Sequence, residues 1–381
     1  MSGPPVTPDP TLAPVVEAPV PVPVARASGR PSRRAQIEEA VLPPLVALLL
    51  AAVVGDLLIL SFGQSPGAVY RLLLDGTWGN AYGFGQVLYK ATTLVFTGLA
   101  VALGLRAGLF NIGAESQLAA GGFCAALVGL LLPPGIPALL CFPVYVLAAA
   151  LGGGAVGAVP GWLKARFGAH EVIVTIMLNF IVLALLNYLV SAKLHVPDTL
   201  HTPELKSGAL PRLGDFIGAF HGSAANATIL LAIITAIVLW WYLFRTRRGF
   251  ELRAVGLQPR AAEYAGVSVA AVTWRALAVS GAIAGIGGLN YVLGYKHYYE
   301  EGFATGAGFL GIAVALVGRN HPLGIVLAAL LFATLSQGGL AVNALVPKQM
   351  VDVLQAVVIL AVSTSVPEVR RLLRLHRSTE S

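Results

Sequence analysis

The stretch VIVTIMLNFIVLALLNYLVSA, residues 172–192, carries no charged side chain and is long enough to cross a lipid bilayer as one helix. A helix rises about 1.5 Å per residue, so about 20 apolar residues span the hydrocarbon layer. Further apolar stretches occupy residues 41–62, 87–105, 112–132, 138–160, 228–244, 272–294, 303–317, 322–340 and 349–366. The sequence therefore predicts an all-α, polytopic transmembrane helical bundle of about eight to ten spans within residues 41–366.

The composition of the whole chain supports the same fold class. Hydrophobic residues make up 56% and charged residues only 11%, whereas a soluble domain carries about 25% charged residues. The mean hydropathy is +0.78. A soluble fold cannot bury that much apolar surface, so we expect one membrane domain rather than the two or three soluble domains that 381 residues would otherwise suggest.

The ends of the chain and one apolar stretch differ from the rest. Residues 1–40 are rich in Pro and Ala and predict a disordered tail, and residues 367–381 predict a basic tail. The stretch 303–317 is short and contains several glycines, so a half-helix or re-entrant segment is about as well supported as a full crossing. We therefore expect discontinuous helices in the bundle.

The positions of the basic residues predict the orientation. Of the 25 Lys and Arg residues, 18 fall on tails and loops that would share one side of the membrane, and 7 fall on the other. Cytoplasmic segments accumulate these cations, so both termini are predicted to be cytoplasmic. The net charge of +7 could also suggest a nucleic-acid binder. A nucleic-acid surface, however, would not place its charges on alternate loops of a membrane bundle, so no nucleic-acid partner is expected.

No nucleotide-binding loop of the Gly-x-x-x-x-Gly-Lys-Ser/Thr type occurs in the sequence. If ATP drives transport, a partner chain must hydrolyse it, and residues 245–267 are the longest connection on the predicted cytoplasmic side. Pro259 is suited to begin a short helix and Gly266 to end it in a left-handed cap. The alternative is a loop that only joins two spans.

Six residues in this connection are predicted to couple ATP hydrolysis to transport. We expect Gly256 to adopt a backbone conformation that a side chain would disfavour. We expect the charges of Glu251 and Arg253 to help dock the segment. The full set is Glu251, Arg253, Gly256, Pro259, Tyr264 and Gly266.

Polar side chains inside apolar stretches are costly and mark candidate sites. Asn111 and Glu115 would share one face if a helix covered both, and Gln117 lies beside them. They could line the solute path at a broken helix, or form a turn whose side chains satisfy nearby backbone groups.

A second polar set lies within the stretch 172–192. Glu171, Thr175 and Asn179 recur at a spacing of four and would share one helix face. The amides and the phenol of Asn179, Asn187 and Tyr188 suit an uncharged, hydroxylated solute such as a ribose or a nucleoside. The alternative role of these residues is to hydrogen-bond neighbouring helices.

Four motifs give the chain a resemblance to a known family. They are GLFNIGAESQ (108–117), EVIVTIMLN (171–179), RAVGL (253–257) and GIAVALVGRNHPLG (311–324). Over residues 40–366 the chain resembles the ABC importer permeases of the ribose, branched-chain amino acid and nucleoside branch, and the first two motifs are most similar to the nucleoside and simple-sugar members. It departs from them at Ser116, where a glycine is expected, and at His170 and Gln258, where asparagine is expected.

The resemblance implies a bacterial inner-membrane protein that moves nucleosides or simple sugars by alternating access. It further implies a cytoplasmic ABC ATPase, a second permease chain, identical or paralogous, and an extracytoplasmic solute-binding lipoprotein, all within membrane lipid. The alternatives are a ribose or branched-chain amino acid permease, and an ion-coupled secondary transporter, which would need more buried charges than this sequence has. No catalytic group, metal site or cofactor is expected, since neither the two cysteines nor the seven histidines show a ligand spacing.

Overall fold

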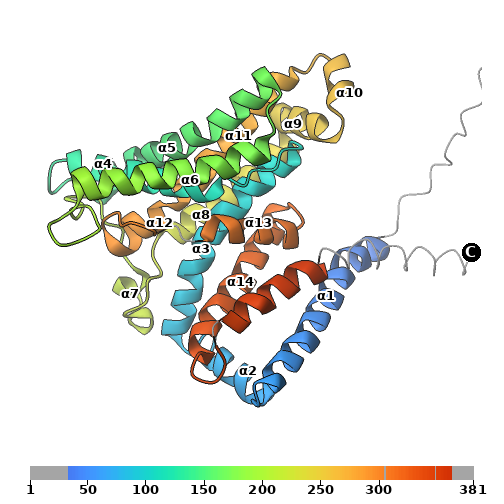
Figure 1. The fold of residues 1–381 in the computed structure, drawn as a ribbon, viewed down its shortest axis with the longest axis vertical. Helices are drawn as coiled ribbons and strands as arrows, with labels where there is room; N and C mark the ends of the chain where they lie inside the picture. The colour runs from blue at the N-terminus through green and yellow to red at the C-terminus, as the bar shows by residue number, and fades with distance from the viewer. Residues whose placement is uncertain (1–32, 304–305, 348, 363–381) are drawn as a thin grey trace, which may run out of the picture. The chain divides into compact units, whose positions relative to one another are not determined.

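The computed structural model describes residues 33–303, 306–347 and 349–362 (Figure 1). The predicted disordered tail lies outside these residues except for 33–40, which already belong to helix α1 (Arg33–Ser61). The predicted basic tail at 367–381 lies wholly outside them. Contacts divide the chain after Leu42, and the account below concerns the unit that begins at Pro43.

The regular elements of the described residues are helices, joined by loops that make two isolated β-bridges, so the predicted all-α class is confirmed. Seven helices are long and apolar enough to cross a membrane, and an eighth span results if Leu45–Ser61 is joined to α2 (Pro66–Asp75) across a bend of 110°. The seven are α3 (Ala81–Arg106), α4 (Ala114–Leu131), α5 (Ala138–Phe167), α6 (Glu171–Leu189), α8 (Thr228–Arg245), α11 (Val269–Gly287) and α14 (Pro322–Val342).

Two further apolar helices are too short to span, namely α13 (Ala307–Val317) and Gln349–Val362. The 11 residues of α13 reach about 16 Å, roughly half the hydrocarbon layer. Within the predicted stretch 303–317, the helix is therefore a half-helix over Ala307–Val317, as one of the two predictions stated. Discontinuity also appears where the π-helical turns Val190–Leu194 and Val292–Lys296 continue the helices before them.

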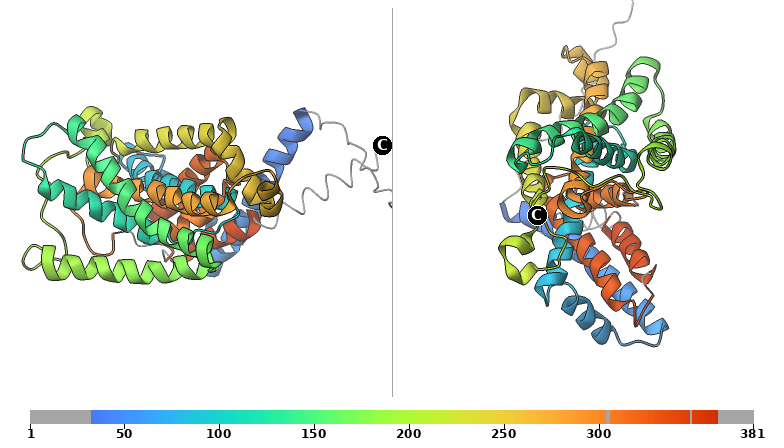
Figure 2. Two further views of the ribbon diagram at one scale, coloured as in Figure 1. Left: turned by 90° about the horizontal axis from the view of Figure 1, so that it is seen from above. Right: turned by 90° about the vertical axis from the view of Figure 1, so that its left-hand side faces the viewer.

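Small residues bring α5 and α11 together over much of their length. A Cβ atom added to Gly281 would lie 2.3 Å from the carbonyl oxygen of Gly153, and one added to Gly285 would lie 2.4 Å from that of Ala149. Glycine permits this approach because it has no Cβ, which is the small-residue packing common in membrane bundles. In contrast, α6 (bright green in Figure 2, left) runs along the edge of this group and exposes most of its side chains.

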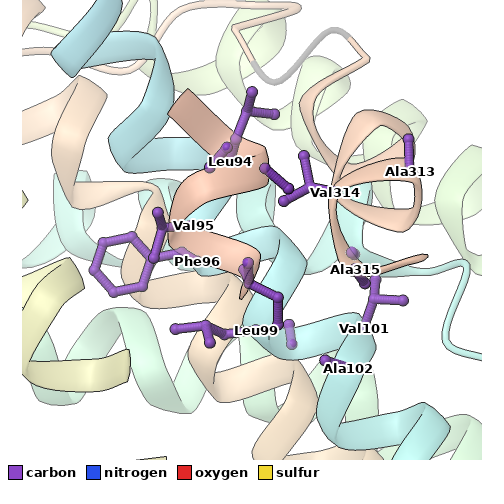
Figure 3. Packing of buried hydrophobic residues seen from close by; sticks show 14 of the residues in the cluster. Leu94, Val95, Phe96, Leu99, Val101, Ala102, Ala313, Val314 and Ala315 are labelled. Carbon is purple, nitrogen blue, oxygen red and sulfur yellow. The ribbon is translucent and has the colours of Figure 1, made fainter. Parts of the chain in front are cut away.

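Helix α3 contributes most to the main apolar core. Leu94 of α3 packs beside Val314 of the half-helix α13, whereas the ring of Phe96 points to the opposite side of α3 (Figure 3). Gly98 lets the two helices approach, because a Cβ there would lie 2.9 Å from a methyl carbon of Val314. The half-helix is therefore held tightly against a full-length span.

Two segments enter the bundle as non-helical chain and continue as a helix. After α3 the chain turns at Gly108, which has a φ of 72°, and Leu109 donates back to the carbonyl of Gly104 at 2.9 Å. α4 then begins inside the bundle. Similarly, α13 begins where the carbonyl oxygen of Ala307 accepts a hydrogen bond from Thr97 of α3 at 3.1 Å, and ends near Arg106, which donates to the carbonyl of Asn320 at 3.0 Å.

A cluster of basic residues marks one end of the described helices, which we call the basic end. It contains the last turns of α3, α5 and α8, the first turns of α11, and the short helices α9 (Arg247–Leu257) and α10 (Pro259–Tyr264) (Figure 1). Its basic residues are Arg106, Lys164, Arg166, Arg245, Arg247, Arg248, Arg253, Arg260 and Arg275. This clustering follows the partition of cations predicted from the sequence.

Candidate functional site

A fully buried polar cluster connects α4 to α6 and α11. Asn111 donates to Gln117 and to Ser280, both at 2.8 Å, and the Gln117 amide donates back to Asn111 at 3.1 Å. On the other side, Asn179 donates to the carbonyl of Ile112 at 2.9 Å and accepts from the amide N–H of Ser116 at 3.1 Å. The structure thus brings Asn179 of the second predicted polar set to the segment that carries Asn111 and Gln117 of the first.

The role of this cluster is to hold the turn before α4. Thr175 is also buried, and its hydroxyl donates to the carbonyls of Glu171 and Val172 in its own helix. Ser116, which stands where the family has glycine, donates to the carbonyl of Gly113 at 3.1 Å and so fits the turn. Because these side chains bond each other and the backbone, the geometry favours the predicted alternative of a self-satisfied turn over a solute lining.

Glu115 links the first turn of α4 to the start of the half-helix α13. Its carboxylate accepts from the backbone N–H groups of Gly306 and Gly308, both at 2.6 Å, at the first turn of α13. Only 3% of Glu115 is exposed. An acidic group at a helix N-terminus satisfies N–H groups that have no partner within the helix and interacts favourably with the helix dipole.

No helix covers both Asn111 and Glu115, because α4 starts at Ala114, so the condition for a shared face is not met. The two side chains are therefore not stacked on one face, and they serve different neighbours. Asn187 and Tyr188 lie away from the cluster, near the far end of α6, and Tyr188 is 61% exposed. The described structure does not bring these two residues to the other predicted path residues.

A cavity of about 290 Å³ lies between α3, α11, α12 (Leu289–Tyr291), α13 and α14. Aromatic rings and apolar side chains form most of its wall, with one lysine, one threonine and one serine among them. The lining residues are Tyr89, Lys90, Thr93, Leu94, Leu118, Gly287, Tyr291, Phe303, Ala307, Leu310 and Ser336. Its volume is close to the lower limit for small-molecule sites.

The sequence predictions named none of these lining residues. One signal was present, because Lys90 lies inside the predicted span 87–105 and a charged side chain within a span marks a functional candidate. Its ammonium group lies 3.4 Å from both the carbonyl and the hydroxyl oxygens of Ser336. The rest of the wall comes from helices distant in sequence, which local patterns do not reveal.

The predicted helix at the basic end is present as α10, which begins at Pro259 and is followed by Gly266 with a φ of 84°. Gln258 at its N-cap makes no capping bond, consistent with the weaker capping expected without asparagine. Tyr264 is 94% exposed. α10 therefore presents an aromatic side chain away from the rest of the chain.

Gly256 is required for a different reason from the one predicted. It lies within α9 and its backbone is not in the left-handed region. A Cβ there would lie 2.2 Å from the carbonyl oxygen of Arg106. The constraint is thus close packing of α9 against the end of α3, and the expectation of an unusual backbone conformation is wrong.

The charges in α9 are held within the chain. Glu251 pairs with Arg247 at 2.9 Å, and the guanidinium of Arg253 lies 5.2 Å from the centre of the Phe244 ring. The ring of His321, at the start of α14, is tilted by 30° against the same Phe244 ring, with 5.6 Å between the two ring centres. Burial and the nearby positive charge of Arg106 lower the pKa of His321 below its ordinary value.

Among the described residues, no three His, Cys, Asp or Glu side chains lie close enough together to hold a metal ion. The buried carboxylate of Glu115 is already committed to backbone N–H groups.

Comparison with known proteins gives consistent results. Residues 83–363 match the family described as branched-chain amino acid transport system, permease component. The chain is 40% identical to the guanosine ABC transporter permease protein NupP of Bacillus subtilis over 85% of this chain and 93% of that protein. It is 35% identical to the nucleoside ABC transporter permease protein NupB of Lactococcus lactis over 84% of this chain and 89% of that protein.

A third relative, the glucose ABC transporter permease protein TsgB13 of Haloferax volcanii, is 33% identical over 84% of this chain and 87% of that protein. No solved structure matches the chain. The curated relatives thus include permeases of two solute classes.

Proposed function

This chain belongs to the family of ABC importer permeases, and from this premise we propose that it carries nucleosides through the membrane. It is a multi-pass, non-catalytic transport subunit, which implies an ATPase and a solute-binding protein as partners. The observation that carries the choice of nucleosides is the 40% identity to a guanosine permease along nearly the whole length of both chains.

We further propose that the basic end faces the cytoplasm and that α9 and α10 receive the motion of the ATPase. The cations at that end support the orientation. The exposed Tyr264 offers an apolar contact outside the spans, and Gly256 packs α9 directly on the end of α3. A second permease chain, identical or paralogous, would complete the pathway, and the solute-binding protein would dock at the opposite end.

Simple sugars are the second candidate solute, because the glucose permease of Haloferax volcanii is 33% identical to this chain. Both candidates are uncharged and rich in hydroxyl groups. They differ in that only a nucleoside carries a planar, aromatic base.

The test is uptake by proteoliposomes that contain the permease, its ATPase and its solute-binding protein. Labelled guanosine should accumulate only when ATP is supplied to the ATPase, and it should exceed accumulation of glucose or leucine. Liposomes without ATP serve as the control. Accumulation of glucose or leucine in place of guanosine would refute the solute, and uptake driven by an ion gradient without ATP would refute the mechanism.

A further inference from the structure

We propose that the cavity between α3, α11, α12, α13 and α14 holds the base ring of the nucleoside during its passage, with Tyr291 and Phe303 as the stacking surface. This inference rests on the proposed function and adds the site and the part of the solute that the site recognises.

The aromatic wall of the cavity is preorganised. The rings of Tyr291 and Phe303 lie 4.7 Å apart between centroids, and Phe303 meets the buried ring of Tyr299 edge-on at 4.9 Å. The Tyr291 hydroxyl donates to Glu300, which fixes the ring from outside the cavity. Every nucleobase has a π-face, so a rigid aromatic surface can accept different bases.

The polar groups of the cavity suit the edge of a base or the hydroxyls of a ribose. The Thr93 hydroxyl oxygen accepts from the side-chain amide of Asn290 at 2.8 Å, which leaves its own hydrogen for another acceptor. Lys90 adds a cation beside Ser336. Lysine donates well to the O6 and N7 acceptors of guanine. The amino acid leucine, as a competing solute, has no aromatic ring that could stack on this wall.

The cavity also adjoins the half-helix α13 and the first turns of α4. Ala307 and Leu310 belong to the first turn of α13, and Leu118 belongs to α4. Glu115 links the starts of these two helices. Transporters commonly place their solute at discontinuous helices, because a small shift of a half-helix changes access to the site.

The experiment compares two phenylalanines that contact the same ring. Phe303 and Phe123 both pack edge-on against Tyr299, at 4.9 and 5.3 Å, but only Phe303 lines the cavity. The variants Phe303→Leu, Tyr291→Leu and the control Phe123→Leu are reconstituted with the ATPase and the solute-binding protein. The readouts are guanosine transported per ATP hydrolysed and the stimulation of hydrolysis by the guanosine-loaded binding protein.

We expect Phe303→Leu and Tyr291→Leu to lower guanosine transport per ATP about tenfold, while the loaded binding protein still stimulates hydrolysis. Phe123→Leu should leave both readouts unchanged. Tyr291→Phe keeps the ring and should keep transport, which separates stacking from the hydrogen bond to Glu300. With 8-azidoguanosine as a photoprobe, label should fall on the segment 289–303 and be displaced by guanosine.

Several outcomes would overturn the inference. If the wild type transports guanosine but Phe303→Leu and Tyr291→Leu behave like Phe123→Leu, the cavity is not the site. If Phe303→Leu and Tyr291→Leu lowered the transport of guanosine and of glucose equally, the two rings would have only a structural role. The same would follow if the photoprobe labelled only residues outside the cavity. Wild-type liposomes that move no guanosine at all would instead refute the proposed function.

Discussion

The contact between Glu115 and the start of α13 should contribute measurably to the stability of the fold. Glu115 accepts from the N–H groups of Gly306 and Gly308, both at 2.6 Å, in a site that is almost fully buried. Hydrogen bonds to charged groups contribute about 1.5–3 kcal/mol each. Glu115→Ala would leave both N–H groups without this acceptor, so we expect a loss of about 3–6 kcal/mol in the free energy of unfolding.

Glu115→Gln keeps one acceptor oxygen and should lose about half as much, roughly 1.5–3 kcal/mol. The assay is the apparent midpoint of thermal unfolding of the detergent-purified protein, followed by loss of its monodisperse elution peak. Glu263→Ala on the exposed face of α10 is the matched control, and surface changes of this kind usually stay within about 0.5 kcal/mol. A Glu115→Ala protein that melts together with the Glu263→Ala control would refute the reasoning.

Four further predictions follow from the packing and the charges. Gly256→Val would place a Cβ atom 2.2 Å from the carbonyl oxygen of Arg106 and so displace α9 from the end of α3. The variant should still insert into the membrane but show reduced solute-stimulated ATP hydrolysis. Normal solute-stimulated hydrolysis would count against a role for α9. Gly285→Val should lower the unfolding midpoint by overpacking α5 on α11, at a cost of about 1–3 kcal/mol, and an unchanged midpoint would contradict that packing. A cysteine at the exposed position 264, made as Tyr264→Cys, should react with a membrane-impermeant thiol reagent only from the cytoplasmic side, and labelling of intact cells from outside would reverse the orientation. Because the pKa of His321 is lowered in the folded state, the unfolded chain takes up a proton near the ordinary pKa of about 6.5, whereas the folded chain does so only at lower pH. Lowering the pH from 7.5 to 5.5 should therefore decrease the melting midpoint more in the wild type than in His321→Gln. An equal decrease in both proteins would refute the shift.

The helices of this fold could be predicted from the sequence because apolar length is a local property. Each predicted apolar stretch corresponds to a helix, and Pro259 and Gly266 correctly marked α10. The sharp bend between α1 and α2 was not predicted, because α2 is a short helix outside the apolar stretches. Hydrophobicity gives the spans but not how a chain turns between them.

The candidate site was predicted only in part, and the errors have identifiable causes. The rule that residues four apart share a face applies within a helix, and Asn111 precedes α4. The partners of Glu115 lie 191 and 193 positions away in sequence, so no local pattern could pair them. Glycine at position 256 was recognised as necessary, but the neighbouring backbone that makes it so belongs to α3.

A continuous series of backbone contacts links the proposed ATPase-facing helices to the cavity. Gly256 of α9 touches the end of α3 at Arg106 and also approaches Gly108, the turn from which the chain re-enters the bundle towards α4. Glu115, in the first turn of α4, then holds the first turn of α13, which forms part of the cavity wall. Coupling between α9 and the cavity can be measured along this series, because each contact in it joins one element to the next. The re-entering segment is the central link, since Asn111 also binds Ser280 of α11 and Gly121 of α4 packs directly on Gly285 of α11. A substitution in this segment should therefore affect both the α9 end and the cavity end of the series.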